Sequence, residues 1–180
     1  SSSAASDVYK RQTLFFPSIV IFNNSIKINL LTRVKSTKTH VRWSNMNGPL
    51  KDLLVIDLTR VLVGPYCTMI LSDLGARVIK VEAPEIGDDS RKFGPFIKDY
   101  SAYFMSLNRG KESIALNLKN EEDKKIFEKI LSRADILVEN FKPGTLEKWG
   151  FGWKAVNKKY PKLIYASASG FGQTGPLKEL

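Results

Sequence analysis

The chain is organised around residues 53–82, LLVIDLTRVLVGPYCTMILSDLGARVIKVE. The apolar run Leu53–Leu58 is long enough for a buried strand. Gly64-Pro65 interrupts the run, and Pro is favoured at the first position of a helix because its missing N–H would be unpaired there anyway. The pattern therefore predicts a strand, a loop, a helix beginning at Pro65 and a second buried strand at Val78–Val81.

The predicted helix carries apolar residues at helical spacing, namely Met69, Ile70 and Leu74, and Gly75 stands where a C-terminal cap glycine belongs. One short helix between two buried strands implies a parallel, right-handed crossover. In open sheets of this kind, ligands bind at the carboxyl ends of the strands. The candidate ligand edge after the first strand consists of Asp57, Thr59, Arg60, Val61, Leu62, Val63 and Gly64.

The rest of the chain to Leu180 repeats the alternation of strands and short helices. Ala83–Tyr100, rich in Gly, Pro and Asp, is expected to be a long loop. Strands are expected at Ser113–Leu118, Ile136–Val138 and Leu163–Ala166, and helices at 102–107, after the Asn120 cap, from Pro143 to Gly150 and at Trp153–Tyr160. The predicted class is α/β with a mostly parallel sheet.

Charge is spread unevenly along the 180 residues, whose net charge is +10. Residues 1–50 hold seven of the 28 basic residues and one of the 18 acidic ones, which leaves 21 and 17, a net +4, for residues 51–180. That excess suits a phosphate-bearing ligand or aids solubility. Nucleic acid is not an expected partner, because the basic residues alternate with acids and no aromatic-basic motif occurs.

The single cysteine, Cys67, and the single histidine, His40, exclude an intramolecular disulfide and a Cys/His metal cluster. No metal site is predicted. Cys67 falls on the first helix and is expected to be a buried small apolar residue rather than a nucleophile. No run of residues reaches the ~18 apolar positions that a membrane span needs, so no membrane is expected as a partner.

The first 47 residues do not share the pattern of the rest. Residues 1–12, SSSAASDVYKRQ, resemble an artefactual leader. Residues 13–47 hold five basic residues and no acid, a composition typical of a mitochondrial transit peptide, and hence of a mitochondrial protein. A disordered leader or translated non-coding sequence before Met46 explains it equally well. Residues 48–180 are the predicted folded part.

Several single motifs are weak by themselves. Residues 170–175, GFGQTG, fit the dinucleotide-binding pattern, but Pro176 follows at once and no downstream acid can be checked, so a close-approach turn is preferred. Isolated carboxylates at strand ends and in loops are more often structural than catalytic. Lysines at such places are usually solvated, although they make good phosphate ligands. These residues are Asp57, Asp88, Asp89, Glu139, Lys119 and Lys148.

Six blocks in a set order are far more specific. They are DLTRVLVGP (57–65), DLGARVIKVE (73–82), GDDSR (87–91), NRGKESI (108–114), VENFKPG (138–144) and SGFGQTGP (169–176). The series resembles the N-terminal part of the family III CoA-transferases, the group of formyl-CoA and carnitine-CoA transferases. Within the family, the likeness is greatest to the mitochondrial members that act on succinyl-CoA and glutarate.

The resemblance implies a Rossmann-like parallel sheet with flanking helices, here an incomplete large domain, and an interlocked homodimer in the complete protein. It also implies that CoA or acyl-CoA, as a substrate rather than a permanent cofactor, lies along the strand ends. The matching CoA-contact positions are Arg60, Val61, Leu62, Val63, Leu116, Lys119, Asn140, Phe141, Lys148 and Trp149, and the positions lining the substrate pocket are Tyr103 and Phe171.

Three departures from the family pattern accompany the likeness. Leu62 stands where formyl-CoA transferase has a glutamine, as expected if the acceptor differs. Ala83 replaces an arginine that grips the nucleotide, which leaves more of the phosphate charge to Lys119 and Lys148. The family's nucleophilic aspartate is expected beyond Leu180, so no catalytic residue is predicted within these 180 residues and the chain alone is expected to be inactive.

The implied reaction is a CoA transfer from an acyl-CoA such as succinyl-CoA to a dicarboxylate such as glutarate. An aspartate would form a mixed anhydride with the acyl group and then a thioester with CoA, splitting one difficult exchange into easier steps. Two alternatives remain open: an α-methylacyl-CoA racemase-like enzyme, which replaces acyl transfer by proton transfer, and a non-catalytic acyl-CoA-binding remnant.

Overall fold

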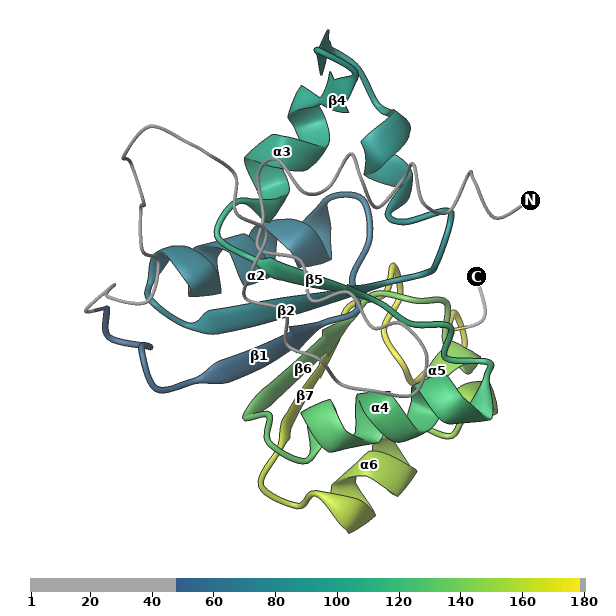
Figure 1. The fold of residues 1–180 in the computed structure, drawn as a ribbon. Helices are drawn as coiled ribbons and strands as arrows, with labels where there is room; N and C mark the ends of the chain where they lie inside the picture. Colours follow the sequence, from purple (N-terminus) through teal and green to yellow (C-terminus); the bar gives the residue numbers. More distant parts are fainter. Residues whose placement is uncertain (1–47, 179–180) are drawn as a thin grey trace.

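A computed structural model describes residues 48–178. Its centre is a five-stranded sheet whose neighbouring strands are all parallel (Figure 1). The spatial order is β5-β2-β1-β6-β7, so the chain starts in the middle, moves outward on one side and then on the other, as in a doubly wound sheet. The strands are β1 (Leu54–Asp57), β2 (Arg77–Glu82), β5 (Glu112–Ala115), β6 (Ile136–Glu139) and β7 (Ile164–Ser167).

Helices cover both faces of the sheet (Figure 1). α2 (Val63–Asp73) and α3 (Ala102–Asn108) lie on one side, and α4 (Glu121–Leu131), α5 (Thr145–Trp149) and α6 (Trp153–Lys159) lie on the other. The predicted α/β class, a parallel sheet flanked by helices, is therefore confirmed. The leader and transit-peptide predictions for residues 1–12 and 13–47 lie outside the described residues.

Strand residues alternate between two apolar clusters because neighbouring side chains of a strand point to opposite faces. Val55 packs with Val78 and Val138 on the α2 side, whereas Ile56 packs with Phe127 of α4 on the other side. Since both faces are covered, the central strands are buried almost throughout, which explains their continuous apolar sequence.

α4 forms as the sequence predicts. The Asn120 side chain accepts a hydrogen bond from the Glu122 N–H at 2.9 Å, and three acidic residues fill the first turn, where they oppose the helix dipole. Phe127 and Leu131, one turn apart, are completely buried against the sheet. Cap and apolar stripe are both local features, and both point to the same helix.

α2 differs from its prediction in two ways. It begins at Val63, two residues before Pro65, without a side-chain cap. Of the three apolar residues expected at helical spacing, Met69 is buried, but Ile70 and Leu74 are 40% and 41% exposed. Cys67 is exposed as well, so the prediction that it is buried is wrong. Apart from Met69, the buried residues of α2 are small or polar, namely Gly64, Pro65, Thr68 and Ser72.

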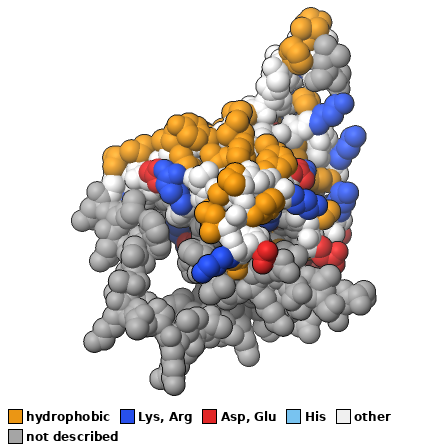
Figure 2. Space-filling view, turned by 90° about the horizontal axis from the view of Figure 1, so that it is seen from above, with side chains coloured by type: hydrophobic (Ala, Val, Ile, Leu, Met, Phe, Trp, Pro, Cys, Tyr) orange, Lys and Arg blue, Asp and Glu red, His pale blue; other side chains and the backbone are white. Residues whose placement is uncertain are grey.

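An apolar surface results on the outer side of α2 and near the projecting hairpin. Figure 2 shows hydrophobic side chains gathered on this side of the molecule. The exposed apolar residues from these segments are Leu62, Val63, Tyr66, Ile70, Leu74, Phe93, Phe96 and Ile97.

The segment 83–100 is not the plain loop that its composition predicted. It contains a 3₁₀ turn, Asp89–Lys92, and the strand β3 (Phe96–Ile97), which pairs antiparallel with β4 (Tyr100–Ser101). Asp88 caps the 3₁₀ turn by accepting the Ser90 N–H at 2.9 Å. The Gly, Pro and Asp residues correctly indicate turns in this segment. The hairpin was not predicted because strands of two residues are too short to show an alternating apolar pattern in the sequence.

Other boundaries shift by a few residues. β5 ends at Ala115 rather than at Leu118, because the Asn117 side chain accepts the Lys119 N–H at 3.1 Å and turns the chain toward the α4 cap. α5 begins at Thr145, two residues after Pro143, because Gly144 adopts a left-handed conformation at its start.

Candidate functional site

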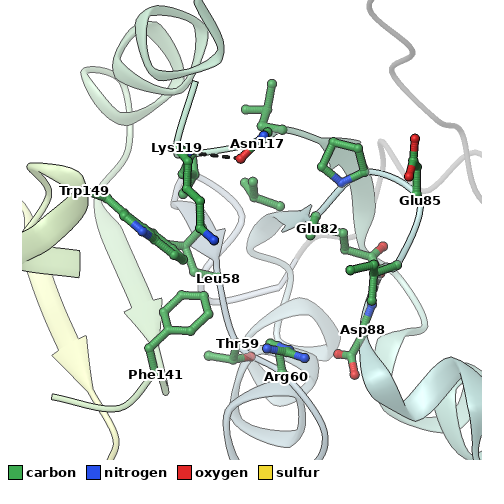
Figure 3. A pocket seen from close by; sticks show the side chains of 17 residues that line it. Leu58, Thr59, Arg60, Glu82, Glu85, Asp88, Asn117, Lys119, Phe141 and Trp149 are labelled. Carbon is green, nitrogen blue, oxygen red and sulfur yellow. Dashed lines mark hydrogen bonds between the residues drawn. The ribbon is translucent and has the colours of Figure 1, made fainter. Parts of the chain in front are cut away.

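A cavity of about 510 Å³ lies at the carboxyl edge of the sheet, where a ligand was expected (Figure 3). The ends of three neighbouring strands and the chain that follows them form most of its wall, and the segment after β6 and helix α5 supply the rest. The lining residues are Leu58, Thr59, Arg60, residues 81–88, residues 116–119, Phe141 and Trp149.

An aromatic pair closes one side of the cavity. The rings of Phe141 and Trp149 meet edge to face with centroids 5.3 Å apart. Lys119 reaches into the cavity from the turn before α4, and Arg60 reaches it from the loop after β1 (Figure 3). A wall of apolar rings with two cations beside it can hold a flat heteroaromatic group together with phosphates.

Asn140 uses its side chain to hold the loop after β1. Its Oδ1 accepts the Arg60 N–H at 2.8 Å, and its Nδ2 donates to the Arg60 carbonyl oxygen at 2.9 Å. The Arg60 guanidinium in turn pairs with the Asp89 carboxylate. Gly64, just beyond this loop, must be glycine, because a Cβ there would lie 2.2 Å from the Thr59 Cβ.

Asp57 lies beneath the same loop and is completely buried. It accepts hydrogen bonds from the Thr59 and Thr68 hydroxyls at 2.5 and 2.6 Å and pairs with the Lys111 Nζ at 2.9 Å. Burial alone would raise the pKa of Asp57, but the charges of Lys80 and Lys111 outweigh it and lower that pKa to about 2. Asp57 is therefore an ionised structural carboxylate.

Glu82, at the end of β2, is held in a similar way. Arg91 binds its carboxylate with two nitrogens at 2.8 and 2.7 Å, and the Ser113 hydroxyl donates to it at 2.9 Å. Burial opposes ionisation, yet the Arg91 hydrogen bonds and charge lower the pKa of Glu82. Gly87 is constrained by this pair, because its φ is +67° and a Cβ there would lie 2.9 Å from the Arg91 Cδ.

Glu139, at the end of β6, is also buried but has a different environment. Its carboxylate accepts the Ser167 hydroxyl and, at 2.8 Å, the Phe141 N–H. Gln173 in turn donates to the Ser167 Oγ at 2.7 Å. Burial raises the pKa of Glu139, and these hydrogen bonds only partly oppose the effect. The group therefore takes up a proton more readily than an ordinary glutamate.

Among residues 48–178, no cluster of three His, Cys, Asp or Glu side chains is placed to hold a metal ion. No helix in this part of the chain is long and apolar enough to cross a membrane.

Comparison with known proteins identifies the family. Residues 50–180 match the family described as CoA-transferase family III. The chain belongs to CoA-transferase family III.

Curated relatives of this family III chain transfer CoA between different acids. Over 130 residues, 72% of this chain and 33% of the relative, it is 58% identical to an acetyl-CoA:oxalate CoA-transferase of Acetobacter aceti. Over 139 residues, 76% of this chain and 32% of the relative, it is 47% identical to the human succinyl-CoA:glutarate CoA-transferase. The chain therefore spans about a third of the length of these relatives.

A solved structure shows the same fold. A CAIB/BAIF family protein from Brucella suis superposes with a TM-score of 0.70 at 44% identity, over 74% of this chain and 36% of that one. The sequence prediction of a family III CoA-transferase and of its parallel α/β fold is thus confirmed.

Half of the residues expected to contact CoA line the cavity at the strand ends. Arg60, Leu116, Lys119, Phe141 and Trp149 line it together. Val61 and Leu62 continue the same loop and Val63 begins α2, but none of the three lines the cavity. Leu62 and Val63 are 47% and 68% exposed. Asn140 stands behind the loop, and Lys148 is exposed on α5 beside Trp149.

The two expected substrate-pocket residues do not meet. The Tyr103 ring packs against Phe93 with centroids 5.6 Å apart, on the hairpin side. Phe171 is 55% exposed in the glycine-rich turn, and neither residue lines the cavity. That Tyr103 and Phe171 line a substrate pocket stays a prediction.

Sequence reasoning missed residues 84–88 as part of the cavity wall. The family block GDDSR (87–91) is the signal in this region, but the contact positions implied by the resemblance do not include it. Lys80 was missed as well, because a lysine inside an otherwise apolar strand has no partner that can be read from the local sequence.

Proposed function

We propose that the whole protein transfers CoA from an acyl-CoA to a dicarboxylate, and that residues 48–178 bind the nucleotide part of the acyl-CoA. The observation that carries the proposal is the cavity at the strand ends, walled by Phe141 and Trp149 and reached by Lys119 and Arg60, in a chain of family III. Residues 48–180 would be the N-terminal part of a larger domain.

The cavity's chemistry fits the nucleotide end of CoA. The Phe141 and Trp149 rings offer apolar surface for an adenine. Lys119 is an exposed cation at the cavity wall and can meet a phosphate as a point charge. Arg60 is already paired with Asp89, so its charge toward a phosphate is partly offset and Lys119 carries more of this role.

For the acids, we propose succinyl-CoA as donor and glutarate as acceptor. Relatives named for this pair are 47% and 48% identical to the chain. The relative named for acetyl-CoA and oxalate is 58% identical and makes that the competing pair. Assays of the whole protein with both donors against both acceptors distinguish the two, because the correct pair has the highest kcat/KM.

The proposed chemistry is covalent. An aspartate beyond Leu180 attacks the thioester carbonyl to form a mixed anhydride and release CoA thiolate. The thiolate then attacks the aspartyl carbonyl, the donor acid leaves, and the acceptor carboxylate repeats the sequence in reverse. Residues 48–178 contribute binding and orientation of CoA to this reaction.

Lys119→Ala tests the binding role. In the whole protein we expect it to weaken CoA binding about 5- to 30-fold at low salt, the range of one charge-assisted hydrogen bond. The loss should shrink as salt is raised, because screening already weakens the wild-type contact. Isothermal titration with CoA measures both effects.

Two controls sharpen this test. Lys129→Ala removes an exposed lysine ten residues further on, in the last turn of α4, and should leave CoA binding unchanged. Dephospho-CoA shows which phosphate is held, because a lysine on the 3′-phosphate matters much less for that ligand. Equal binding by wild type and Lys119→Ala at low salt would contradict the proposed contact.

Turnover decides between the open alternatives. CoA binding without transfer activity in the whole protein would favour a non-catalytic acyl-CoA-binding protein. Exchange of the α-proton of an α-methylacyl-CoA, without transfer, would favour the racemase-like alternative.

A further inference from the structure

Two opposite charges are buried beneath the loop that follows β1. Lys80, in β2, and Asp88, in the segment after β2, are each only 1% exposed, and Lys80 Nζ lies 2.9 Å from Asp88 Oδ2. Burying two charges costs several kcal/mol before their attraction is counted. A pair of apolar residues of similar size would often be at least as stable, so the pair calls for a reason beyond stability.

Both members of the pair also hold the backbone of the loop. Lys80 Nζ donates to the Thr59 carbonyl oxygen at 2.8 Å, and Asp88 Oδ1 accepts the Val61 N–H at 3.1 Å. These backbone groups lie on either side of Arg60, whose own N–H and C=O are held by the Asn140 side chain. Four successive backbone groups of the loop are thus bound by three side chains from other segments.

Val61 shows what these contacts maintain. Its φ is +71°, a left-handed conformation that costs a β-branched residue free energy and persists only where the surroundings impose it. Glycine would adopt it without cost. The strained residue directly follows Arg60, which lines the cavity.

The neighbouring carboxylates have ion-pair partners of their own, although the Lys80 charge also favours their ionised forms. Asp57 pairs with Lys111, and Glu82 pairs with Arg91. Asp88 is further anchored by the Ser90 N–H and hydroxyl at 2.9 and 2.7 Å. Lys80 and Asp88 are the pair whose hydrogen bonds reach the loop backbone on both sides of Arg60, at the Thr59 carbonyl and the Val61 N–H.

We propose that Lys80 and Asp88 are positioning residues that lock residues 59–62 in the left-handed turn and thereby present Arg60 to the acyl-CoA. The inference rests on the proposed function for the identity of the ligand. The locking itself is a property of the chain that can be measured without ligand.

The test is a glycine rescue in the whole protein. Asp88→Ala should weaken succinyl-CoA binding about tenfold, because the loop leaves the strained turn when its acceptor is lost. Adding Val61→Gly should recover most of that loss, since glycine keeps the turn unaided, whereas adding Val61→Ala should recover little. Arg77→Ala, which breaks an exposed ion pair with Glu112 at the other end of β2, should not change binding.

Two further measurements keep the test decisive. Lys80→Met/Asp88→Leu removes both charges at similar volume and leaves neither of them buried alone, so it should fold and still bind about tenfold more weakly. Hydrogen exchange of the Arg60 amide reports on the turn, because its acceptor, Asn140 Oδ1, is kept in both variants. Without ligand, this exchange should speed up in both variants and slow again with Val61→Gly.

The outcomes separate the two claims. Absence of acyl-CoA binding by the wild type would overturn the proposed function, while faster exchange at the Arg60 amide in the variants would still support the locking. Wild-type binding with unchanged affinity and unchanged exchange in the charge-free variant would overturn the positioning role. A loss of binding that Val61→Gly does not restore would also overturn it, because the pair would then act otherwise than through the turn.

Discussion

The two halves of the sheet's carboxyl edge bury acidic side chains in opposite ways. At the ends of β1 and β2, Asp57 and Glu82 are each paired with a cation, Lys111 and Arg91. At the end of β6, Glu139 is 4% exposed, yet no ion pair reaches it among residues 48–178. Its partners are the Ser167 hydroxyl and the Phe141 N–H.

The difference shows that burial does not by itself decide the state of a carboxylate. Burial by itself would raise the pKa of both Asp57 and Glu139. In Asp57 the charges of Lys80 and Lys111 reverse the direction, whereas in Glu139 burial prevails. In the β1–β2 half, paired acids and cations therefore surround and hold the loop after β1. The β6–β7 half carries Glu139, an acid that has no ion pair within the described part of the chain and can gain a proton.

The largest loss of stability should come from breaking a buried ion pair in the β1–β2 half. Asp57→Ala leaves Lys111 buried without its carboxylate, so we expect the free energy of unfolding to fall by about 3–5 kcal/mol. Urea unfolding of the whole protein at pH 7 measures it. Asp73→Ala is the matched control, because its ion pair with Arg109 is exposed and should be worth no more than about 1 kcal/mol. A loss of similar size in both variants would contradict the comparison.

Acid should weaken the same half by a smaller amount. The folded-state pKa of Asp57 is about 2 against an ordinary value of 3.8, so its contribution is complete above about pH 4 and lost as the pH falls toward 2. Asp88 and Glu82 have lowered pKa values and act in the same direction. Asp57 alone should contribute about 2 kcal/mol at pH 6. About 1 kcal/mol of this should be lost by pH 3, which urea unfolding at the two pH values measures.

The acid prediction has its own control. Asp57→Asn cannot titrate, so its unfolding free energy should fall less steeply with acid than that of the wild type. Parallel curves for the two proteins would show that Asp57 is not ionised in the folded state.

The smallest expected change in stability comes from Glu139, and its dependence on pH is opposite in sign to that of Asp57. Since the pKa of Glu139 is raised, the folded state holds the proton more tightly than the unfolded state, and stability is lost as the pH rises from about 4.5 through the raised pKa. Glu139→Gln removes that loss and keeps an acceptor for the Phe141 N–H. We expect it to be more stable than wild type at pH 7 by less than about 1 kcal/mol, with the gap closing at pH 4.

Differential scanning fluorimetry at both pH values can detect the Glu139 effect. A Glu139→Gln protein that is less stable than wild type at pH 7 would mean that the ionised carboxylate is paired after all, and that the two halves of the edge are alike.

The sequence by itself determined the elements and the class of this protein. Apolar runs such as Val78–Val81 predict buried strands, and the Asn120 cap with Phe127 and Leu131 predicts α4, because propensity, capping and periodicity act within one or two turns of the chain. The ordered blocks also indicated family III and brought Arg60, Lys119, Phe141 and Trp149 forward as candidates that do line one cavity.

Only the tertiary structure decided which charges are buried, what pairs with them and which faces stay open. In the sequence, Lys80 interrupts an apolar strand without an evident partner. In the folded structure it pairs with Asp88 and donates to the Thr59 carbonyl oxygen. Cys67 and Ile70 follow a helical pattern, yet α2 turns its small and polar side to the sheet and leaves both exposed. The physical reason is the same in each case: the environment of a side chain is set by residues distant in sequence, and no local pattern records that environment.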